Sequence, residues 1–392
     1  MTIGLLCDYL EADEMGIKLT AEELGIDIAY VPFRKISIGI GEDGYSFRSK
    51  GNDYSYVLKR VEAVLNRAQS KNRRLMAASF LEAIDKHTIN PLNVEFICFS
   101  KFRTLLCLLK NGVRVPKTVF VPCDSHETTK NGNEIHNEED IADLVQLEIN
   151  DEMLVVKPDA GTHGREVRLA KNHKEFLEML KKVKPSIINP VGVLAQKFIQ
   201  KWFYDLRIIV FKEKGKVPYC YPKAMARAGF KDFRTNTALG NFVFGVDLPG
   251  YIRDIAIKCG NAIGGTCEAW LLALDAMIDF GEEKFVDDKY IKSELERLEI
   301  PFKVFKRVKG DPMKKSNFPS WNKKLEEAFQ EYTNLEAYEN VRKIINESVE
   351  KNKYNVLFHE ANSCPEFWEQ TRLATGANLA EFLFNCAKSI IN

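Results

Sequence analysis

The sequence predicts a mixed α and β protein of about two or three lobes. The chain has 392 residues, more than one ordinary domain usually holds. Apolar, strand-like runs alternate with helix-like segments over residues 1–122, as in an α/β lobe. Farther along, strands follow one another with few helices between them, until a long polar segment, 282–353, interrupts the series.

The first lobe is predicted to begin as strand, helix and strand, at residues 3–10, 11–26 and 28–33. Gly25 is well placed to end this helix. Residues 55–61 and 72–91 continue the alternation, and the second stretch predicts a helix, a turn and a strand. A helix at 100–112 then leads into a strand at 115–122.

Strands dominate the rest of the chain, at residues 152–158, 166–170, 192–199, 205–211, 219–227, 270–280 and 355–362. The polar, turn-rich stretch 124–138 is expected to be an exposed connection. The last two strands are expected to be neighbours, although the segment 282–353 lies between them in the chain. That segment is dense in charge and is predicted to be mainly helical.

The charges of the chain nearly cancel. Lys and Arg number 56 and Asp and Glu 55, so bulk electrostatics gives no support for binding nucleic acid or a membrane surface. The nine cysteines form no CxxC pair and lie mostly in apolar surroundings, which indicates buried free thiols in a reducing compartment. No stretch has the length and apolar character of a membrane span, and the N-terminus does not resemble a signal peptide. A cytoplasmic location is expected.

Three oxygen-bearing side chains could gather where the last two strands end. Glu360 and Asn362 are two residues apart, so in a strand they point to the same face. If residues 270–280 pair beside 355–362, Asp275 joins them. Two carboxylates and an amide oxygen suit Mg²⁺, which takes few protein ligands and completes its shell with water and phosphate oxygens. A capping or turn network at a strand end is the alternative.

Cationic residues elsewhere could bind phosphate or carboxylate groups. Lys157 ends a strand before a loop with Gly161 and Gly164, where glycines let backbone N–H groups approach an anion. A glycine hairpin with a surface lysine is the alternative, and the pattern matches neither a P-loop nor a dinucleotide fingerprint. The strands and the loop that follow carry Asp205, Arg207, Arg227, Arg234 and Asn236. Charges on the solvated face of antiparallel strands would give the same pattern.

Taken in order, these residues resemble an ATP-grasp carboxylate–amine ligase of the RimK type. The resemblance covers most of the chain outside 282–353 and rests on the runs SKFRTLLCLLKNGVRVPKT, VVKPDAGTHGREV, LAQKFIQ, DLRIIVF, AMAR, DFRTNTALGN, LDAMIDF and EANSCPEF. It implies an ATP-grasp fold with an N-terminal α/β pre-ATP-grasp domain (1–122) and a central lid subdomain (123–200). The C-terminal subdomain (201–392) would contain an antiparallel sheet and carry 282–353 as a helical insertion.

The resemblance also implies a role for each site residue. The residues implied to bind ATP are Lys101, Lys157, Gly161, Gly164, Gln196, Lys197, Ile199, Asp205 and Arg207, with Asp205 reaching the ribose. Those implied to contact the reacting phosphate and acyl group are Arg227, Arg234 and Asn236. The implied ligands of Mg²⁺, with Mn²⁺ as an alternative metal, are Asp275, Glu360 and Asn362. The implied reaction is phosphorylation of a carboxylate, followed by attack of an amine on the acyl phosphate to form an amide.

The implied substrates are an acidic carboxylate acceptor and an amino acid, such as glutamate, that donates the amine. The acceptor could be a small molecule or the end of a peptide or carrier protein. A small-molecule kinase on the same fold and a non-catalytic nucleotide-binding protein acting through its insertion are the alternative functions. Four basic residues could hold the acceptor or merely begin a solvated helix: Arg67, Lys71, Arg73 and Arg74. A homo-oligomer is expected only by analogy.

The chain departs from the family pattern in two places. Glu366 stands where the family usually has glycine, which adds a carboxylate near the acceptor side. The insertion 282–353 is expected to bind a partner or to form oligomers, with an inert elaboration as the alternative. Two residues near the metal motif, His359 and Cys364, are expected to be structural, with His359 on the face opposite Glu360. His163, in the glycine loop, could neighbour a phosphate.

Overall fold

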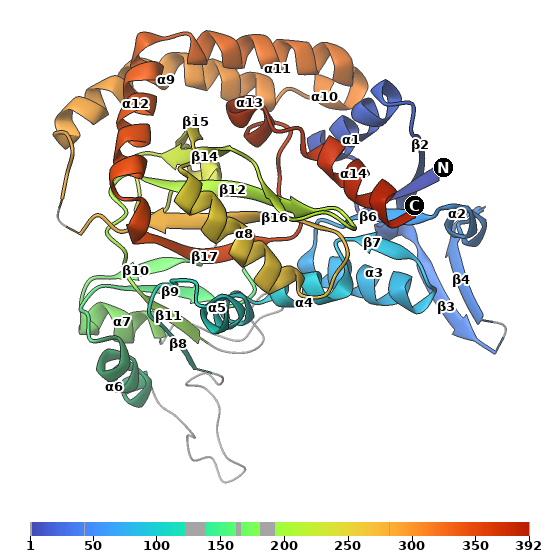
Figure 1. Ribbon diagram of the computed structural model, residues 1–392, viewed down its shortest axis with the longest axis horizontal. Coiled ribbons are helices and arrows are strands. Elements are labelled where there is room, and N and C mark those ends of the chain that lie inside the picture. Colours follow the sequence, from blue (N-terminus) through green and yellow to red (C-terminus); the bar gives the residue numbers. More distant parts are fainter. Residues whose placement is uncertain are drawn as a thin grey trace.

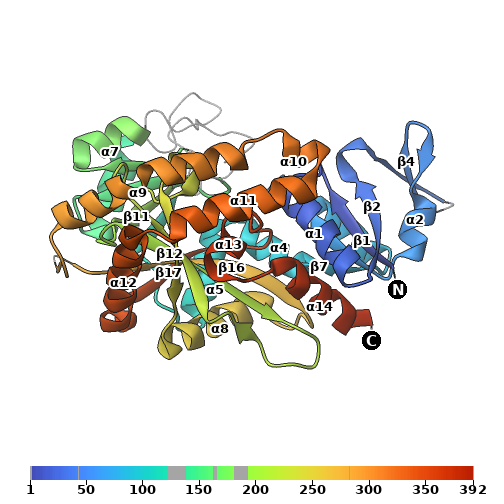
Figure 2. The same ribbon diagram turned by 90° about the horizontal axis from the view of Figure 1, so that it is seen from above.

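The computed structural model describes residues 2–42, 44–121, 138–161, 166–180, 193–281 and 283–391. Helices surround several separate β-sheets, which confirms the predicted mixture of α and β structure (Figure 1). The first and last described residues lie on the same side of the molecule in both views (Figure 2).

The N-terminal lobe contains a parallel sheet in the order β2-β1-β6-β7. Its strands are β1 (Thr2–Cys7), β2 (Asp27–Pro32), β6 (Ala63–Arg67) and β7 (His87–Ile89). The helices of this lobe are α1 (Ala12–Glu23), α2 (Ser55–Arg60), α3 (Lys71–Ala83) and α4 (Leu92–Phe99). A smaller antiparallel sheet, which the sequence did not indicate, consists of β3 (Ser37–Gly41), β4 (Gly44–Ser49) and β5 (Asn52–Asp53).

A second sheet lies below the others in Figure 1 and is antiparallel, in the order β10-β9-β11-β8. Its strands are β8 (Thr118–Val121), β9 (Leu154–Pro158), β10 (Arg168–Ala170) and β11 (Val193–Lys197). Helices α6 (Glu138–Ile149) and α7 (His173–Leu180) pack on it. Their apolar side chains form a core of their own, which includes Val156 and Phe176.

The largest sheet is antiparallel and has the order β15-β14-β12-β16-β17, with β13 beside β12. Its strands are β12 (Tyr204–Lys212), β13 (Tyr219–Cys220), β14 (Lys223–Ala228), β15 (Phe242–Asp247), β16 (Trp270–Ile278) and β17 (Val356–Asn362). The helices outside the insertion that pack around it are α5 (Lys101–Lys110), α8 (Gly250–Gly264), α13 (Thr371–Thr375) and α14 (Leu379–Ile391). Strands β16 and β17 are therefore neighbours, although more than seventy residues separate them in the chain.

The segment between these two strands is helical and packs closely on the large sheet. It contains α9 (Asp288–Lys309), α10 (Met313–Ser316), α11 (Phe318–Thr333) and α12 (Glu336–Lys351). Phe302, Trp321 and Tyr332 belong to the same apolar core as the sheet. The Tyr332 hydroxyl also donates a hydrogen bond to the Val243 carbonyl of β15 (3.0 Å). The insertion is thus part of the core of this lobe.

No helix in the described ranges is both long and apolar enough to cross a bilayer.

Candidate active site

A cavity of about 790 Å³ lies where three parts meet: the N-terminal lobe, the large sheet, and the second sheet, β10-β9-β11-β8, which is called the lid sheet below. Such a volume is within the range of about 300–1,000 Å³ that is usual for small-molecule sites. All the site residues predicted from the sequence line it, except Gly164, which lies outside the described residues. His163 is likewise outside them. The structure therefore brings together side chains that are up to 261 positions apart, from Lys101 to Asn362.

Strands β16 and β17 place two carboxylates opposite each other. Asp275 pairs with Glu360 in the register, and Asn362 lies opposite Ala273. The register then shifts, so that the next pair joins Ala276 to Phe358 and leaves one extra residue on β17. The sheet thus presents Asp275, Glu360 and Asn362 to one cavity.

The extra residue is His359, and it corrects one expectation. Strict alternation places His359 on the face opposite Glu360, but the bulge breaks the alternation and His359 also lines the cavity. Its Nε2 atom is buried and has no hydrogen-bond partner within the described part of the chain. Burial and the neighbouring Lys157 lower the pKa of His359 to about 4, so the imidazole is neutral at physiological pH.

Glu360 lies among several cations. The Lys101 Nζ atom is 3.8 Å from Glu360 Oε1. Burial alone would raise the pKa of Glu360, but Lys101, Lys71 and other nearby cations outweigh it and lower that pKa to about 2. Burial, followed by repulsion from Lys101, lowers the pKa of Lys71 and of Lys157 to about 8. Three lysines around one glutamate leave an excess of positive charge that suits a polyanion.

Asp275 is held in a buried network of ion pairs. Arg207 binds it with two parallel hydrogen bonds, Nε to Oδ1 at 2.9 Å and a terminal nitrogen to Oδ2 at 3.0 Å. Arg227 lies between Asp275 (3.2 Å) and Asp205 (2.7 Å). Burial opposes ionisation of Asp275, but Arg207 and Arg227 lower its pKa below the usual value. The second oxygen of Asp205 lies 3.6 Å from Lys201, so both carboxylate oxygens of Asp205 face protein cations rather than open space.

The donor set of the cavity fits a magnesium ion with few protein ligands. Among the described residues, no group of three or more His, Cys, Asp or Glu side chains could hold a metal ion, so a third protein ligand here has to be of another type. The third candidate ligand is therefore the amide of Asn362, whose buried Nδ2 atom has no partner there. Two carboxylates and one amide are hard oxygen donors, and such a set leaves positions for water and phosphate oxygens.

The lid sheet contributes the opposite wall. Lys157 of β9 donates a hydrogen bond to Gln196 Oε1 of β11 (2.9 Å). Lys101 donates to the Gly161 carbonyl (2.8 Å), so one lysine connects the glycine loop to Glu360. Lys197 is half exposed and lies 3.1 Å from Asp151. The nearby Ile199 is buried and apolar, as one side of a planar base would require.

The loop between β14 and β15 forms another part of the wall. Arg234 is ion-paired with Asp232 (2.8 Å). The Asn241 amide donates to the carbonyls of Arg234 and Asn236 (both 3.1 Å), which fixes the path of the loop. Gly240 ends a short turn there with φ +91°, a conformation that favours glycine.

Four basic residues were suggested for the acceptor. Of these, Lys71 lines the cavity and, among the described residues, has no carboxylate within ion-pair distance. Arg73 is partly exposed, pairs with Asp8 (2.7 Å) and does not line the cavity. Arg74 is buried against Glu95 (2.8 Å). Arg67 is buried and serves an internal network, described next.

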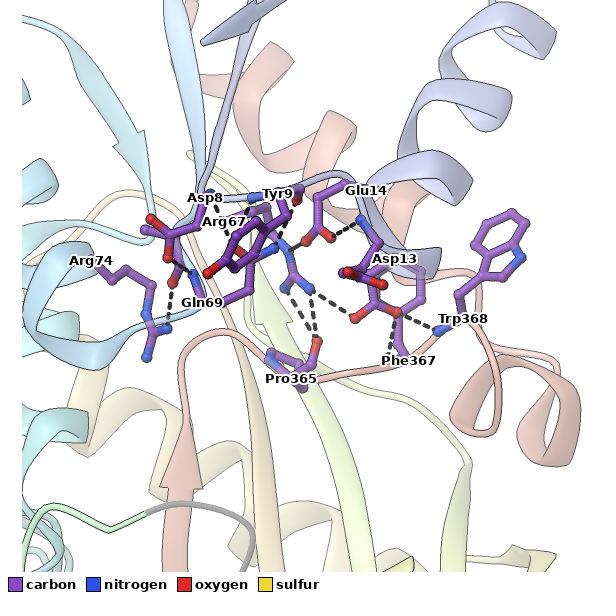
Figure 3. A network of polar contacts seen from close by, with 12 residues as sticks. Asp8, Tyr9, Asp13, Glu14, Arg67, Gln69, Arg74, Pro365, Phe367 and Trp368 are labelled. Carbon is purple, nitrogen blue, oxygen red and sulfur yellow. Dashed lines mark hydrogen bonds and ion pairs between the residues drawn. The ribbon is translucent and has the colours of Figure 1, made fainter. Parts of the chain in front are cut away.

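Arg67 joins the N-terminal lobe to the loop that follows β17. It contacts Asp13 (3.1 Å) and Glu14 (3.3 Å) of α1 and donates two hydrogen bonds to the Pro365 carbonyl, at 3.1 and 3.2 Å. Asp13 in turn accepts hydrogen bonds from the backbone N–H groups of Phe367 and Trp368 (3.0 and 2.8 Å). Figure 3 shows these groups converging on Arg67 from both sides. The network fixes the segment that contains Glu366.

The insertion also reaches the cavity, which sequence reasoning missed. Its contribution consists of Lys306, Lys309, Gly310 and Lys314. The spacing of Lys306 and Lys309 on one helix face was the only available signal. Lys309 and Lys314 lie 3.1 and 3.5 Å from Glu369, which follows β17 in the chain.

The cysteines in the described part of the chain are poorly suited to chemistry. The eight within the described ranges are free thiols. Cys364 lines the cavity, but burial raises its pKa, so the thiol stays protonated.

Comparison with known proteins agrees with this geometry. Residues 98–280 match the model of the RimK-like ATP-grasp domain. The chain is 25% identical over 280 residues to the alpha-aminoadipate–LysW ligase LysX of Sulfurisphaera tokodaii, covering 71% of this chain and 86% of that protein. It is 26% identical over 195 residues to the coenzyme gamma-F420-2:alpha-L-glutamate ligase of Methanocaldococcus jannaschii, covering 48% and 57% of the two chains.

Solved structures give the fold. The ATP-grasp ligase PsnB, complexed with a minimal precursor, superposes with a TM-score of 0.55 over 99% of this chain and 98% of that one, at 11% identity. Another PsnB structure, with a phosphomimetic variant of the minimal precursor, Mg and ADP, has a TM-score of 0.54 over 100% of this chain and 98% of that one, at 10% identity. The chain therefore has the ATP-grasp fold with a RimK-like ATP-grasp domain at residues 98–280, and it is an ATP-dependent ligase that joins a carboxylate to an amine.

Proposed function

We propose that this ligase activates an acidic acceptor as an acyl phosphate and then joins the amine of an amino acid to it. The arrangement of three lysines around one glutamate, with a second carboxylate opposite, supports this most strongly. The residues concerned are Lys71, Lys101, Lys157, Glu360 and Asp275. Such a site offers positive charge for a triphosphate and oxygen ligands for its magnesium ion.

The lid wall suits the nucleotide. Lys101 and Lys157 would bind phosphate oxygens, and Gly161 leaves room for the backbone to approach them. The base would lie against the end of β11, near Gln196, Lys197 and Ile199. When bound, Mg²⁺ would neutralise phosphate charge, held by Asp275, Glu360 and Asn362. Mn²⁺ has similar ligand preferences and could replace it.

Two residues expected to contact ATP directly are assigned a different role by the proposal. Asp205 would hold Arg227 in place through their 2.7 Å contact. Arg207 would hold Asp275 through its paired hydrogen bonds. Both would then be positioning residues, because a guanidinium or carboxylate fixed by an ion pair loses little freedom when substrate binds.

The proposed chemistry proceeds in two steps. A carboxylate oxygen of the acceptor attacks the γ-phosphorus, the bond from that phosphorus to the bridging oxygen breaks, and ADP leaves. The amine nitrogen then attacks the acyl carbon and loses a proton, and the carbon–oxygen bond breaks to release phosphate. Arg227 and Arg234, with Asn236 nearby, would offset the negative charge as it moves between these groups. No side-chain nucleophile is required.

The substrates proposed are acidic. By name, the relatives in the comparison act on alpha-aminoadipate and on L-glutamate, both dicarboxylic amino acids. Glutamate or a similar amino acid is therefore the proposed amine donor. The proposed acceptor is an acidic small molecule or an acidic peptide or carrier-protein terminus.

The test is ADP and phosphate formation by the purified protein. The protein is incubated with Mg-ATP, L-glutamate and a panel of acidic acceptors, with and without the amine, and products are identified by mass spectrometry. A ligase forms an amide and releases phosphate only when the amine is present. A phosphorylated acceptor that persists in the presence of amine, or no ADP above background with any acceptor, would refute the proposal.

A further inference from the structure

Helix α9 of the insertion presents Lys306 to the cavity. Lys306 lines it together with Arg234 and Asn236 of the loop between β14 and β15. Its Nζ atom lies 3.4 Å from the position that a Cβ atom on Gly240 would occupy. The insertion therefore touches the loop that carries Arg234.

Lys306 differs in its pairing from the other two insertion lysines that line the cavity. Lys309 and Lys314 are both ion-paired with Glu369, at 3.1 and 3.5 Å. Within the part of the chain that the structure describes, no carboxylate forms an ion pair with Lys306. Partial burial and repulsion from Lys231 and Lys309 lower the pKa of Lys306. Those two lysines have carboxylate partners, Glu299 (3.3 Å) and Glu369 (3.1 Å), whereas the Lys306 ammonium group would need an external anion to compensate its charge.

Lys306 shares the outer part of the cavity with Arg234 and Asn236. Two other side chains expected at the reacting centre, Arg227 and Asp275, are almost fully buried, each 4% exposed. Lys306 is solvent-exposed, so a ligand can reach it from outside. In Figure 1, helix α9 and the lid sheet lie on opposite sides of the large sheet. A nucleotide held by the lid wall would therefore leave Lys306 to another ligand.

We propose that Lys306 binds a carboxylate of the acceptor other than the one that reacts. This inference rests on the proposed ligase function and narrows its substrate to compounds with two or more carboxylates. A dicarboxylic amino acid and an acidic peptide share this chemistry. The ammonium group would form one charge-assisted hydrogen bond with the second carboxylate, while the first reaches the γ-phosphate. The insertion would thereby select the acceptor.

The test compares Lys306→Gln with two matched variants. Lys306→Arg keeps the charge, whereas Lys303→Gln removes a lysine of the same helix that is exposed, pairs with Glu299 (3.2 Å) and does not line the cavity. Binding of a fluorescein-labelled tetraglutamate peptide is measured by anisotropy with Mg-ADP present. Lys306→Gln should weaken binding about tenfold, as loss of one charged hydrogen bond does. Lys303→Gln should not change it, and Lys306→Arg should restore most of it.

Salt and competition separate the alternatives. The loss of peptide affinity caused by Lys306→Gln should be smaller at about 0.5 M than at about 0.05 M salt, since an exposed ion pair is screened.

Displacement of the peptide by L-glutamate at comparable concentration identifies a free amino acid as the acceptor. Displacement only by acidic peptides identifies a peptide as the acceptor. Equal losses for Lys306→Gln and Lys303→Gln, or equal binding of tetraglutamine, overturn the proposal. So does a protein that binds Mg-ATP but neither glutamate nor tetraglutamate. Absence of Mg-ATP binding would instead refute the proposed function.

Discussion

Replacing Arg67 by methionine should leave two buried carboxylates without their cation. Arg67, Asp13 and Glu14 are 4%, 9% and 2% exposed, and the guanidinium contacts the two acids at 3.1 and 3.3 Å. Methionine fills much of the volume but carries no charge or donor. Removing one partner of a buried ion pair costs about 3–5 kcal/mol, so the free energy of unfolding should fall by about that amount at pH 8. The two hydrogen bonds to the Pro365 carbonyl are lost as well.

The loss of unfolding free energy caused by Arg67→Met, called the deficit below, should depend on pH. In the wild-type protein burial raises the pKa of Asp13 to about 7, despite the attraction of Arg67, and also raises the pKa of Glu14. A carboxyl group whose pKa is raised by folding stabilises the fold fully when the pH is below its pKa in the unfolded chain, about 4. That stabilisation is lost as the pH rises through its pKa in the folded protein. Without Arg67 the pKa values of Asp13 and Glu14 rise further. The variant therefore continues to lose stability at pH values at which the wild-type protein no longer does. The deficit should therefore be larger at pH 8 than at pH 5.5. It should grow by about 1.4 kcal/mol for each pH unit over which the folded variant binds one proton more than the folded wild-type protein.

Urea unfolding of both proteins, followed by tryptophan fluorescence at the two pH values, measures this difference. The double variant Asp13→Asn/Arg67→Met is the matched control, because it removes one of the stranded charges. It should be less sensitive to pH than Arg67→Met alone. A deficit below about 1 kcal/mol at pH 8, or the same deficit at both pH values, would refute the electrostatic reasoning.

Three further substitutions test the site and the fold. Glu360→Gln should reduce ADP formation by about a hundredfold or more, since the amide keeps the shape but removes the charge proposed to hold the metal. Unchanged turnover with intact circular dichroism would contradict the assignment. Lys157→Met should weaken Mg-ATP binding about tenfold or more in calorimetry, whereas Lys174→Met, at an exposed position of helix α7, should have no effect. Equal affinities would exclude a phosphate contact for Lys157. Gly245→Ala should lower the melting temperature markedly, because the new Cβ atom would lie 1.8 Å from the Ala374 carbonyl oxygen and overpacking costs about 1–3 kcal/mol or more. An unchanged melting temperature would show that this contact yields easily.

Alternation along a strand predicted only part of the site. Glu360 and Asn362 share a face in any regular strand, and both line the cavity. The predicted sheet face of His359 was wrong because β17 carries an extra residue opposite β16. A bulge of this kind cannot be recognised from a pattern of apolar residues. Residues 55–61 were expected only to continue the alternation, without an assigned type; they contain helix α2, and the next strand is Ala63–Arg67. Short apolar runs do not distinguish a helical turn from a strand.

The roles of charged residues depended still more on the fold. Arg67 and Lys71 look alike in the sequence, but the first is bound by Asp13, Glu14 and Pro365, whereas the second remains a cation at the cavity. The partners of Arg67 lie 54, 53 and 298 positions away. No local pattern identifies partners at such separations.

The sequence by itself determined the order of motifs, and through it the ATP-grasp fold and the enzyme family, because backbone preferences and the types of ligand residues are local properties. Tertiary structure decided which charges are compensated and which face the cavity, since charge interactions depend on distances of a few ångströms in space. It also decided the place of the insertion, whose position in the chain suggests an appendage but whose apolar faces complete the core of the large sheet. That packing brings Lys306 to the cavity, where a substrate can meet it.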